Sequence, residues 1–202
     1  MNVLCLDLEG VLVPEVWQAV ADRTGIAALR KTTRDIPVYD DLMRARLAIL
    51  DEHSLPLSTI QDVIAGLDPL PGASDFLAWA REHYQVAILS DTFYEFGMPL
   101  MAKLDHPLLL CHRLVVDGGR IVGYRLRQED PKRQAVRAFH AMNYRVVAAG
   151  DSYNDVAMLE EADIGLFFDA PPSVVAQYPS FQAVAGYEEL VAALGPLARE
   201  GI

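Results

Sequence analysis

The sequence has 202 residues, of which 52% are hydrophobic, so it can bury one sizeable core and carry a small additional module. Its formal net charge of −11 excludes nonspecific nucleic-acid binding, which needs clustered lysine and arginine, and is compatible with cation binding. The two cysteines, Cys5 and Cys111, form no paired-cysteine motif, so we expect neither a disulfide framework nor a structural zinc site.

The sequence shows no sign of a membrane or export segment. No apolar run reaches the roughly 18 residues that a membrane-spanning helix requires. Asp7 and Glu9 interrupt the N-terminal apolar stretch too early for a signal peptide. We therefore expect a cytoplasmic protein without a membrane partner.

Three apolar stretches have the character of buried parallel strands, and each ends on an acid or a hydroxyl group. They are residues 3–6 before Asp7, residues 86–89 before Ser90 and Asp91, and residues 146–149 before Gly150 and Asp151. In an open α/β sheet, ligands bind beyond the carboxyl ends of the strands. The pattern therefore predicts an α/β fold in which these polar groups meet at one crevice.

Between the first and second of these stretches, the pattern is almost purely helical. We expect helices at residues 15–24, 39–52 and 58–65, separated by Gly25 and Gly66 and followed by the breaker at 69–72. This arrangement predicts a helical cap at residues 14–72, inserted into a Rossmann-like core of residues 1–13 and 73–202 with a parallel sheet. Pro14 and residues 69–72 are the expected hinges.

After residue 72, strand and helix signals alternate as in a parallel crossover order. Helices are expected at residues 72–82, 93–104 and 131–142. Residues 109–116 and 120–128 flank an Asp-Gly-Gly turn and predict a β-hairpin or a short antiparallel excursion. His106, Cys111 and His112 border this hairpin without a paired ligand motif, so we assign them ordinary surface or packing roles.

Asp7 and Glu9 form the first candidate catalytic pair. Because the chain must turn at Gly10, both carboxylates can approach one site from different directions. With an ordinary carboxyl pKa, Asp7 is ionised at neutral pH and can attack a phosphorus atom. Glu9 could protonate the leaving oxygen and later accept a proton from water, a task that requires a raised pKa.

Because these carboxylates and a phosphate are all negatively charged, we expect a cation to bind between them. Asp7 and Asp151 offer hard oxygen ligands suited to Mg²⁺, which is bound through one or two carboxylates together with water and substrate oxygens. Zinc would be expected to use histidine or cysteine. The turn that carries Asp151 also contains the amide of Asn154 and the carboxylate of Asp155.

Ser90 and Lys132 are candidates for binding a phosphoryl group. Ser90 is expected at the end of the second strand and directly before a helix, where a hydroxyl and backbone N–H groups point at an anion. Lys132 follows Asp130-Pro131, which is typical of an N-cap and a first-turn proline. Lys132 should therefore lie in the first turn of a helix, with its charge within reach of a phosphate.

The expected cap contains an arginine on an apolar helix face. Arg46 lies near the middle of an arc formed by Leu42, Met43, Ala45, Leu47, Ile49 and Leu50. A buried arginine needs an anionic partner, either a substrate carboxylate or a structural ion pair with Glu15 or another acid. In the absence of a ligand, we expect Arg46 and Glu15 to pair. A helix dipole also favours an acid at the position of Glu15.

These residues carry a family resemblance that extends over nearly the whole chain. Asp7-Leu8-Glu9-Gly10-Val11, Ser90, Lys132 and the segment Gly150-Asp151-Ser152-Tyr153-Asn154-Asp155 resemble the four ordered motifs of the haloacid dehalogenase superfamily. Within it the chain resembles the phosphoserine phosphatases, and most closely those of the ThrH type. These are described as phosphoserine phosphatases that also pass the phosphoryl group to homoserine.

The resemblance implies a role for each motif residue. Asp7 would be the nucleophile and Glu9 the acid and base. Mg²⁺ would be held by the Asp7 side chain, the Glu9 main-chain carbonyl and Asp151. Ser90 and Lys132 would contact the phosphate, with Asn154 and Asp155 supporting them. Glu15 is similar to the family's ammonium-binding acid, so Glu15 and Arg46 would bind the two charged ends of an amino acid.

Glu9 departs from the family pattern, in which most members carry aspartate at this position. The extra methylene moves the carboxyl group by roughly 1 Å, which is enough to alter proton-transfer geometry. Slower activation of water would let an alcohol such as homoserine compete for the phosphoryl group.

The favoured function is therefore Mg²⁺-dependent phosphoryl transfer from the small molecule O-phosphoserine to water or homoserine. A phosphatase for another small phosphomonoester is an alternative. A metal-independent dehalogenase-like hydrolase would use Asp7 but would not need Glu9, Asp151 and Asp155. A phosphate-sensing module without catalysis would be expected to be shorter and uncapped. The sequence leaves open whether the protein forms a homodimer.

Overall fold

A computed structural model describes residues 1–32, 35, 36 and 38–199 of the chain. These residues contain a seven-stranded sheet in the order β4-β3-β2-β1-β5-β6-β7, parallel except for β4 at one edge. The strands are β1 Asn2–Leu6, β2 Gln85–Phe93, β3 Leu108–Asp117, β4 Arg120–Arg125, β5 Arg145–Gly150, β6 Ile164–Phe168 and β7 Gln182–Val184. The expected α/β fold with a mostly parallel sheet is confirmed.

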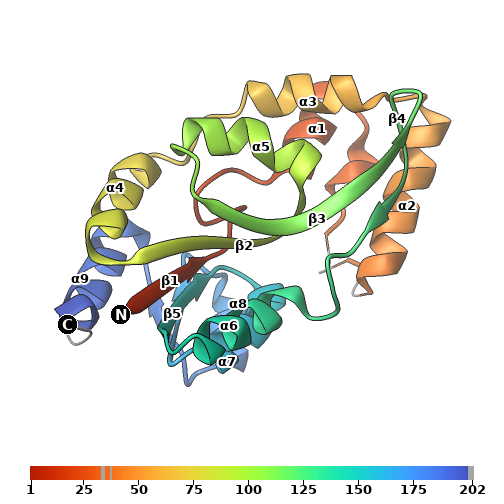
Figure 1. The fold of residues 1–202 in the computed structure, drawn as a ribbon. Helices are drawn as coiled ribbons and strands as arrows, with labels where there is room; N and C mark the ends of the chain where they lie inside the picture. Colours follow the sequence, from red (N-terminus) through yellow and green to blue (C-terminus); the bar gives the residue numbers. More distant parts are fainter. Residues whose placement is uncertain (33–34, 37, 200–202) are drawn as a thin grey trace.

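Helices connect the strands and cover both faces of the sheet (Figure 1). They are α1 Val16–Thr24, α2 Tyr39–Glu52, α3 Leu57–Ala65, α4 Ala73–His83, α5 Tyr94–Lys103, α6 Pro131–Ala141, α7 Val156–Glu161, α8 Pro172–Gln177 and α9 Gly186–Arg199. Two short 3-10 helices, η1 Ala27–Arg30 and η2 Tyr153–Asp155, complete the list. Each helix expected from the sequence is present, with its ends shifted by one residue at most.

Strand β1 is buried on both faces because its alternate side chains pack against different helices. Leu4 and Leu6 belong to a hydrophobic cluster with residues of α4, α5 and α9. Val3 and Cys5 belong to a second cluster with residues of α6, α7 and α8. This double coverage explains the continuous apolar runs in the sequence, since strands buried on both faces lack polar alternation.

The segment between β1 and β2 contains α1, α2 and α3, which lie beside α5 and the β3–β4 hairpin (Figure 1). Its buried residues Val20, Met43 and Ile60 join the same hydrophobic cluster as Leu4 of the sheet. The inserted helices therefore share a continuous apolar core with the sheet side of the molecule. Residues 33, 34 and 37 of the expected cap lie outside the described residues.

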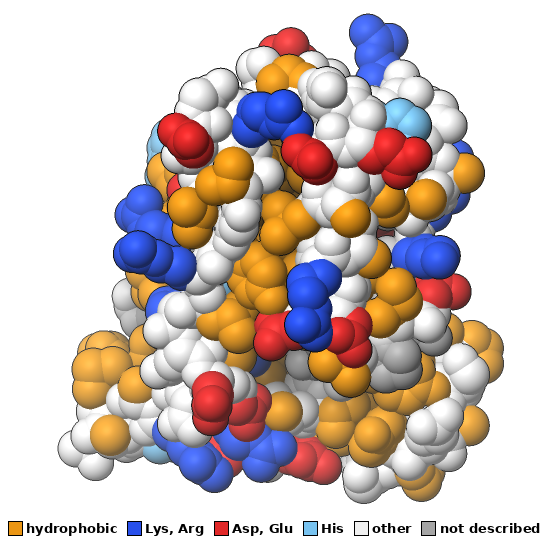
Figure 2. Space-filling view, turned by 90° about the vertical axis from the view of Figure 1, so that its right-hand side faces the viewer, with side chains coloured by type: hydrophobic (Ala, Val, Ile, Leu, Met, Phe, Trp, Pro, Cys, Tyr) orange, Lys and Arg blue, Asp and Glu red, His pale blue; other side chains and the backbone are white. Residues whose placement is uncertain are grey.

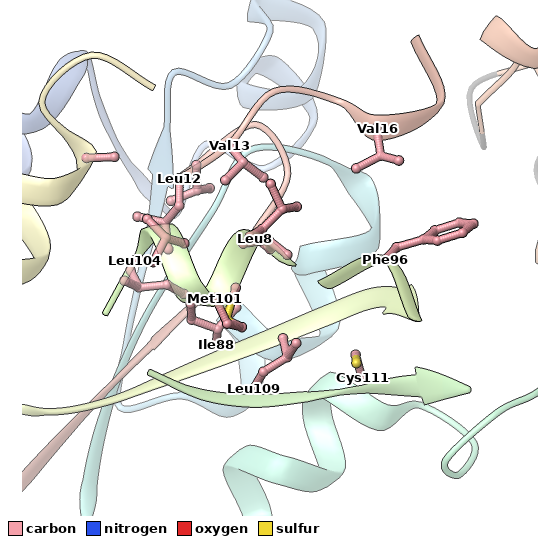
Figure 3. Close-up of a cluster of buried hydrophobic side chains, with 14 of the residues drawn as sticks. Leu8, Leu12, Val13, Val16, Ile88, Phe96, Met101, Leu104, Leu109 and Cys111 are labelled. Carbon is pink, nitrogen blue, oxygen red and sulfur yellow. The ribbon is translucent and has the colours of Figure 1, made fainter. Parts of the chain in front are cut away.

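The turn after β1 is held by apolar packing. Figure 3 shows Leu8, Leu12 and Val13 directed toward side chains of β2 and α5, among them Ile88 and Met101. The turn is closed by backbone hydrogen bonds from Leu12 N to Leu8 O, at 2.8 Å, and from Gly10 N to Val13 O, at 2.9 Å. The polar side chains in this turn therefore project from a backbone that is fixed by the hydrophobic core.

The expected β-hairpin is present, and its strands β3 and β4 form one edge of the sheet. β3 pairs in parallel with β2, and β4 pairs antiparallel with β3. The hairpin also contacts the inserted helices through three polar interactions: Tyr124 with Asp40, Arg120 with Asp51, and the Leu57 N–H with the Gly119 carbonyl at 2.9 Å. It therefore joins the edge of the sheet to α2 and to the start of α3.

Surface charges are mixed on the side of the molecule that carries α2 and β4, where Figure 2 shows acidic and basic side chains interspersed. Among the described residues, none of the helices has the length and apolar character needed to cross a bilayer. Cys5 and Cys111 are both free and buried.

Candidate active site

A cavity of about 730 Å³ opens where the carboxyl ends of β1, β2 and β5 face α1 and α2. Of the ten residues that the sequence proposed for a site, eight line this cavity: Asp7, Glu9, Glu15, Arg46, Ser90, Asp91, Asp151 and Asn154. The other two, Lys132 and Asp155, do not line the cavity. Lys132 forms ion pairs with both Asp7 and Asp155. The fold therefore brings all ten residues together.

Lys132 is the central cation of this group. Its Nζ lies 2.6 Å from Asp155 Oδ1, 2.9 Å from Asp7 Oδ1 and 3.8 Å from Asp91 Oδ2, and the side chain is 3% exposed. Burial disfavours the charged amine, but the three carboxylates outweigh it and raise the pKa of Lys132 well above its ordinary value. Lys132 therefore remains a cation in this acidic surrounding.

The start of α6 agrees with the expectation except for the hydrogen bonding of Asp130. Lys132 does lie in the first turn of α6, after Pro131. Asp130 occupies the expected N-cap position before Pro131, but its φ is +44° and its side chain makes no cap hydrogen bond. The Asp130 carboxylate instead forms an ion pair with Arg133, at 3.0 Å.

Asp155 is fully buried and holds the turn that follows β5. Its Oδ1 accepts a hydrogen bond from Lys132, while its Oδ2 accepts from the N–H groups of Asp151, at 3.0 Å, and Ser152, at 3.1 Å. A Cβ at Gly150 would lie 2.3 Å from Asp155 Cγ, so only glycine allows the strand to pass this carboxylate. Asp155 thus fixes the position of Asp151.

The pKa of Asp7 differs from the ordinary carboxyl value that was expected. Burial raises its pKa well above the ordinary carboxyl value, and the charge of Asp155 adds to this increase, while Lys132 opposes it and Asp151 increases it further. The assumption of an ordinary pKa for Asp7 is therefore wrong for the site without a further cation. A divalent cation beside Asp7 would favour its ionised form.

The acid cluster suits such a cation. Carboxylate oxygens of Asp7, Asp151 and Asp155 lie within 4.8 Å of one another. Asp7 and Asp151 line the cavity, whereas Asp155 does not line it and accepts hydrogen bonds on both oxygens, so Asp7 and Asp151 are the better ligand candidates. Two carboxylates with the remaining positions filled by other oxygens match the preference of Mg²⁺.

Glu9 is half-buried at the turn after β1, and its Oε2 accepts a hydrogen bond from the N–H of Val16, at 2.9 Å. It thereby binds the first turn of α1. Burial and the charge of Glu15 raise the pKa of Glu9 to about 7, although the bond from Val16 and the charge of Arg46 oppose the shift. A carboxyl group with this pKa can both donate and accept a proton near neutral pH.

Ser90 is buried at the cavity wall, but the expected end of the second strand at this residue is wrong. β2 continues to Phe93 and α5 begins only at Tyr94, while the pairing with β3 shifts register between Leu89 and Phe93. The N–H of Thr92 donates to Ser90 Oγ, at 3.2 Å. The hydroxyl is therefore positioned by an irregular strand end and not by a helix N-terminus.

Asp91 connects the carboxyl end of β2 with several other elements. Asn154 Nδ2 donates to its Oδ2 at 3.0 Å, and the Tyr39 hydroxyl of α2 donates to its backbone carbonyl at 3.0 Å. Burial would raise the pKa of Asp91, but Lys132, His112 and Asn154 together lower it below its usual range. Asp91 is therefore an anion that links the β5 turn to β2.

His112 was assigned an ordinary surface or packing role from the sequence, yet it is 2% exposed and lines the cavity. Its Nδ1 accepts a hydrogen bond from the N–H of Arg127, at 3.1 Å, so the proton is assigned to Nε2. Nε2 lies 3.6 Å from Asp91 Oδ1. No short-range signal marks His112, because only strand pairing sets it beside Phe93 of β2.

Arg46 is 8% exposed and projects from the buried face of α2, as the helical pattern predicted. Among the described side chains it forms no ion pair with Glu15, so the expected pairing is wrong. Burial lowers the pKa of Arg46 to about 10, against the charges of Glu9, Tyr39 and Glu15. Glu15 precedes α1 at its N-cap position and makes no side-chain cap bond there.

Trp17 is a second cavity residue that the sequence did not reveal. It lies in the first turn of α1, and its ring is stacked under the guanidinium of Arg46, with 4.6 Å from the guanidinium carbon to the ring centroid. In the sequence an apolar residue at this helix position cannot be told from an ordinary core residue.

Comparison with known proteins gives consistent matches. The family model described as haloacid dehalogenase-like hydrolase matches residues 9–160. The phosphoserine phosphatase ThrH of Pseudomonas aeruginosa is 61% identical over 191 residues, which cover 94% of this chain and 93% of that protein. A phosphoserine phosphatase of Pseudomonas syringae pv. tomato is 60% identical over 94% of this chain and 81% of its own length.

Solved structures agree with the fold. A phosphoserine phosphatase in its apo form gives a TM-score of 0.76 at 20% identity, covering 96% of this chain and 97% of the other. A phospho-aspartyl intermediate analogue of phosphoserine phosphatase gives a TM-score of 0.77 at 19% identity, with the same coverage. The family match and the identity to the two Pseudomonas proteins show that the chain belongs to the haloacid dehalogenase-like hydrolase family, in the group that includes the ThrH phosphoserine phosphatase.

Proposed function

We propose that the protein is a Mg²⁺-dependent phosphoserine phosphatase that forms an aspartyl phosphate on Asp7. The observation that carries the proposal is the cluster of Asp7, Asp151 and Asp155, two of which pair with Lys132, beside a cavity that also contains Glu9 and Arg46. The names of the two Pseudomonas relatives, at 61% and 60% identity, support phosphoserine as the substrate.

The proposed reaction has two displacements at phosphorus. A carboxylate oxygen of Asp7 attacks the phosphorus, the bond from phosphorus to the serine oxygen breaks, and Glu9 protonates that oxygen as serine leaves. Glu9 then takes a proton from water, whose oxygen attacks the phosphorus and releases phosphate and the Asp7 carboxylate. A Glu9 pKa of about 7 suits both proton transfers.

The remaining polar residues of the cavity would bind the phosphoryl group. Asp7, Asp151 and the main-chain carbonyl of Glu9 would hold Mg²⁺, which supplies positive charge to the phosphoryl oxygens when bound. Ser90 and Lys132 would contact these oxygens as well. Asp155 fixes Asp151 and Lys132, and Asn154 binds Asp91, so these two residues would support the ligands.

Residues of the inserted helices would recognise the amino-acid part. Arg46 would bind the substrate carboxylate and Glu15 its ammonium group, since both side chains line the cavity and form no ion pair with each other among the described residues. Residues 14–72 would act as a cap on a core of residues 1–13 and 73–202, with hinges at Pro14 and residues 69–72. The two free, buried cysteines support a reducing, cytoplasmic location.

The first test is release of phosphate from O-phosphoserine with and without Mg²⁺, in wild-type protein and in Asp7→Asn. We expect Mg²⁺-dependent turnover with O-phosphoserine preferred over other small phosphomonoesters, and no turnover in Asp7→Asn, because an amide cannot form the acyl phosphate. Circular dichroism serves as the folding control. Unchanged activity in Asp7→Asn would refute the nucleophile, and turnover in a metal chelator would favour the metal-independent hydrolase.

The second test concerns the acceptor. We infer that Glu9, with one methylene more than aspartate, activates water slowly enough for homoserine to compete for the phosphoryl group. Product analysis with O-phosphoserine and homoserine should therefore yield O-phosphohomoserine beside inorganic phosphate, and Glu9→Asp should shift the products toward phosphate. Phosphate as the sole product at every homoserine concentration would reject the transfer.

A further inference from the structure

The guanidinium of Arg46 is held in the cavity wall with few hydrogen-bond partners. Its Nη2 donates to the Lys31 carbonyl at 2.9 Å, and its Nη1 lies 3.9 Å from the sulfur of Met43. Its buried Nε has no partner among the described residues. A guanidinium carries five N–H donors, so most of those of Arg46, which lines the cavity, are not used by the described residues.

The ring of Trp17 lies against the face of this guanidinium. The guanidinium carbon of Arg46 lies 4.6 Å from the centroid of the Trp17 ring, which is within the range of a cation–π interaction. The ring is itself fixed, because it is 7% exposed and packs edge-on against Phe96 at a centroid distance of 5.6 Å. Trp17 and Arg46 both line the cavity.

The type of contact matters for what Arg46 can still bind. A carboxylate partner would occupy the N–H donors at the edge of the guanidinium and neutralise its charge. The face of an aromatic ring orients the same group and leaves those in-plane donors available. Trp17 thus holds Arg46 in one orientation without using the groups that recognise an anion.

We propose that Trp17 is a positioning residue that determines specificity: its ring orients Arg46 so that the guanidinium selects phosphomonoesters carrying a carboxylate. This inference rests on the proposed function, in which Arg46 binds the carboxylate of the substrate. Since that carboxylate takes no part in the chemistry, loss of the ring should weaken binding in the ground state and transition state alike. The effect should therefore appear in KM and not in kcat.

The test compares two donors that differ in the carboxylate, O-phosphoserine and O-phosphoethanolamine. In Trp17→Leu we expect the ratio of kcat/KM for O-phosphoserine to that for O-phosphoethanolamine to fall about tenfold, through a higher KM for O-phosphoserine. Trp17→Phe retains an aromatic face and should restore most of the ratio. The ratio is independent of the fraction of folded enzyme, so partial unfolding of a variant cannot imitate the effect.

The chain provides a matched control, because its second tryptophan, Trp79, packs on α4 against Phe76 and His83, away from the cavity lining. Trp79→Leu should leave the ratio unchanged. An unchanged ratio in Trp17→Leu, or a parallel loss with both donors, would overturn the role of Trp17 as a determinant of specificity. Failure of the wild-type protein to hydrolyse O-phosphoserine would instead reject the proposed function.

A fluorescence titration tests the same contact without turnover. In Trp79→Phe, Trp17 is the sole tryptophan, so the emission reports on the ring beneath Arg46. Serine carries the carboxylate but no phosphate, and we expect it to change this emission, whereas ethanolamine should not. Equal responses to serine and ethanolamine, or no response to serine, would contradict the proposal.

Discussion

At the scale of single residues, Gly10 combines two requirements that no other residue type meets. Its φ is +81°, and a Cβ at this position would lie 2.7 Å from the carboxyl carbon of Asp151. Such a backbone conformation disfavours side chains, and the close approach excludes them. Gly10 thereby lets the turn that carries Glu9 lie against the turn that carries Asp151.

We predict that Gly10→Ala lowers kcat/KM about 100-fold, because a displacement on the order of 1 Å at the catalytic turn disrupts alignment. Gly25→Ala is the matched control, since Gly25 has φ +73° but a Cβ there would meet no atom within 4 Å. Both variants should lose roughly 1–2 kcal/mol of stability from the strained backbone. Equal activity of the two variants would contradict this account of Gly10.

The order of polar motifs was sufficient to find eight of the ten site residues, because polar groups at strand ends and helix starts carry a chemical signal. Arg46 followed from the pattern of its helix, and Glu15 from the family resemblance. Trp17 and His112 could not be found in this way. Each lies in an apolar stretch where its pattern matches ordinary core packing, and only the tertiary arrangement brings it to the cavity. Aromatic cavity residues are thus harder to predict than charged ones.

At the scale of elements, the boundaries that carry local signals agree with the sequence. α1 ends at Gly25, which has φ +73° and donates its N–H to the Ala21 carbonyl, as expected for a glycine C-cap. The extension of β2 to Phe93 carries no such signal, because the apolar run stops at Leu89. Pairing with β3 and the register shift decide this boundary, and both depend on distant residues.

The connection between α7 and β6 offers a test of pH-dependent stability. The carboxylate of Asp163 accepts hydrogen bonds from Val146 N, at 2.7 Å, and from His140 Nε2, at 3.0 Å. Burial opposes the shift, but these bonds lower the pKa of Asp163 below its usual value. The stabilisation is therefore fully present above the unfolded-state pKa of about 3.9 and is lost as the pH falls through the lower folded-state pKa.

We predict that Asp163→Ala reduces the free energy of unfolding by about 1 kcal/mol near pH 6, since the N–H of Val146 loses its partner. The difference from wild type should shrink as the pH falls below about 4 and should vanish only below the folded-state pKa of Asp163, where this carboxyl group is protonated in both states. Urea denaturation at several pH values measures this difference. Asp163→Asn keeps an acceptor oxygen, so its deficit should be smaller; a deficit for Asp163→Ala that stays constant down to pH 2 would disprove the assignment.

At the scale of the whole molecule, repulsion among the site acids leads us to expect that a bound cation increases stability. Carboxylate oxygens of Asp7, Asp151 and Asp155 lie within 4.8 Å of one another, and Lys132 pairs with Asp7 and Asp155. A cation that binds only the folded state stabilises it, by about 2.7 kcal/mol at 100 times its Kd. For a chain of this length, that corresponds to a rise in Tm of roughly 5–10 °C.

We predict that Mg²⁺ raises the Tm of the wild-type protein and that Asp151→Asn weakens the rise strongly. Asp105→Asn is the control, because this carboxylate is exposed and distant from the cluster, and its variant should respond to Mg²⁺ like wild type. Differential scanning fluorimetry over a Mg²⁺ titration provides the measurement. The same response in all three proteins would argue against a specific ion at Asp151.

The contacts between the β3–β4 hairpin and the inserted helices constrain how this scaffold can be re-engineered. Since the Leu57 N–H binds the Gly119 carbonyl and Arg120 pairs with Asp51, two segments far apart in the chain form one complementary seam. In a chimera that receives only the inserted helices of a relative, these helices would no longer match the hairpin residues that they contact. Grafting a new specificity onto this enzyme core therefore calls for transplanting both segments as a unit.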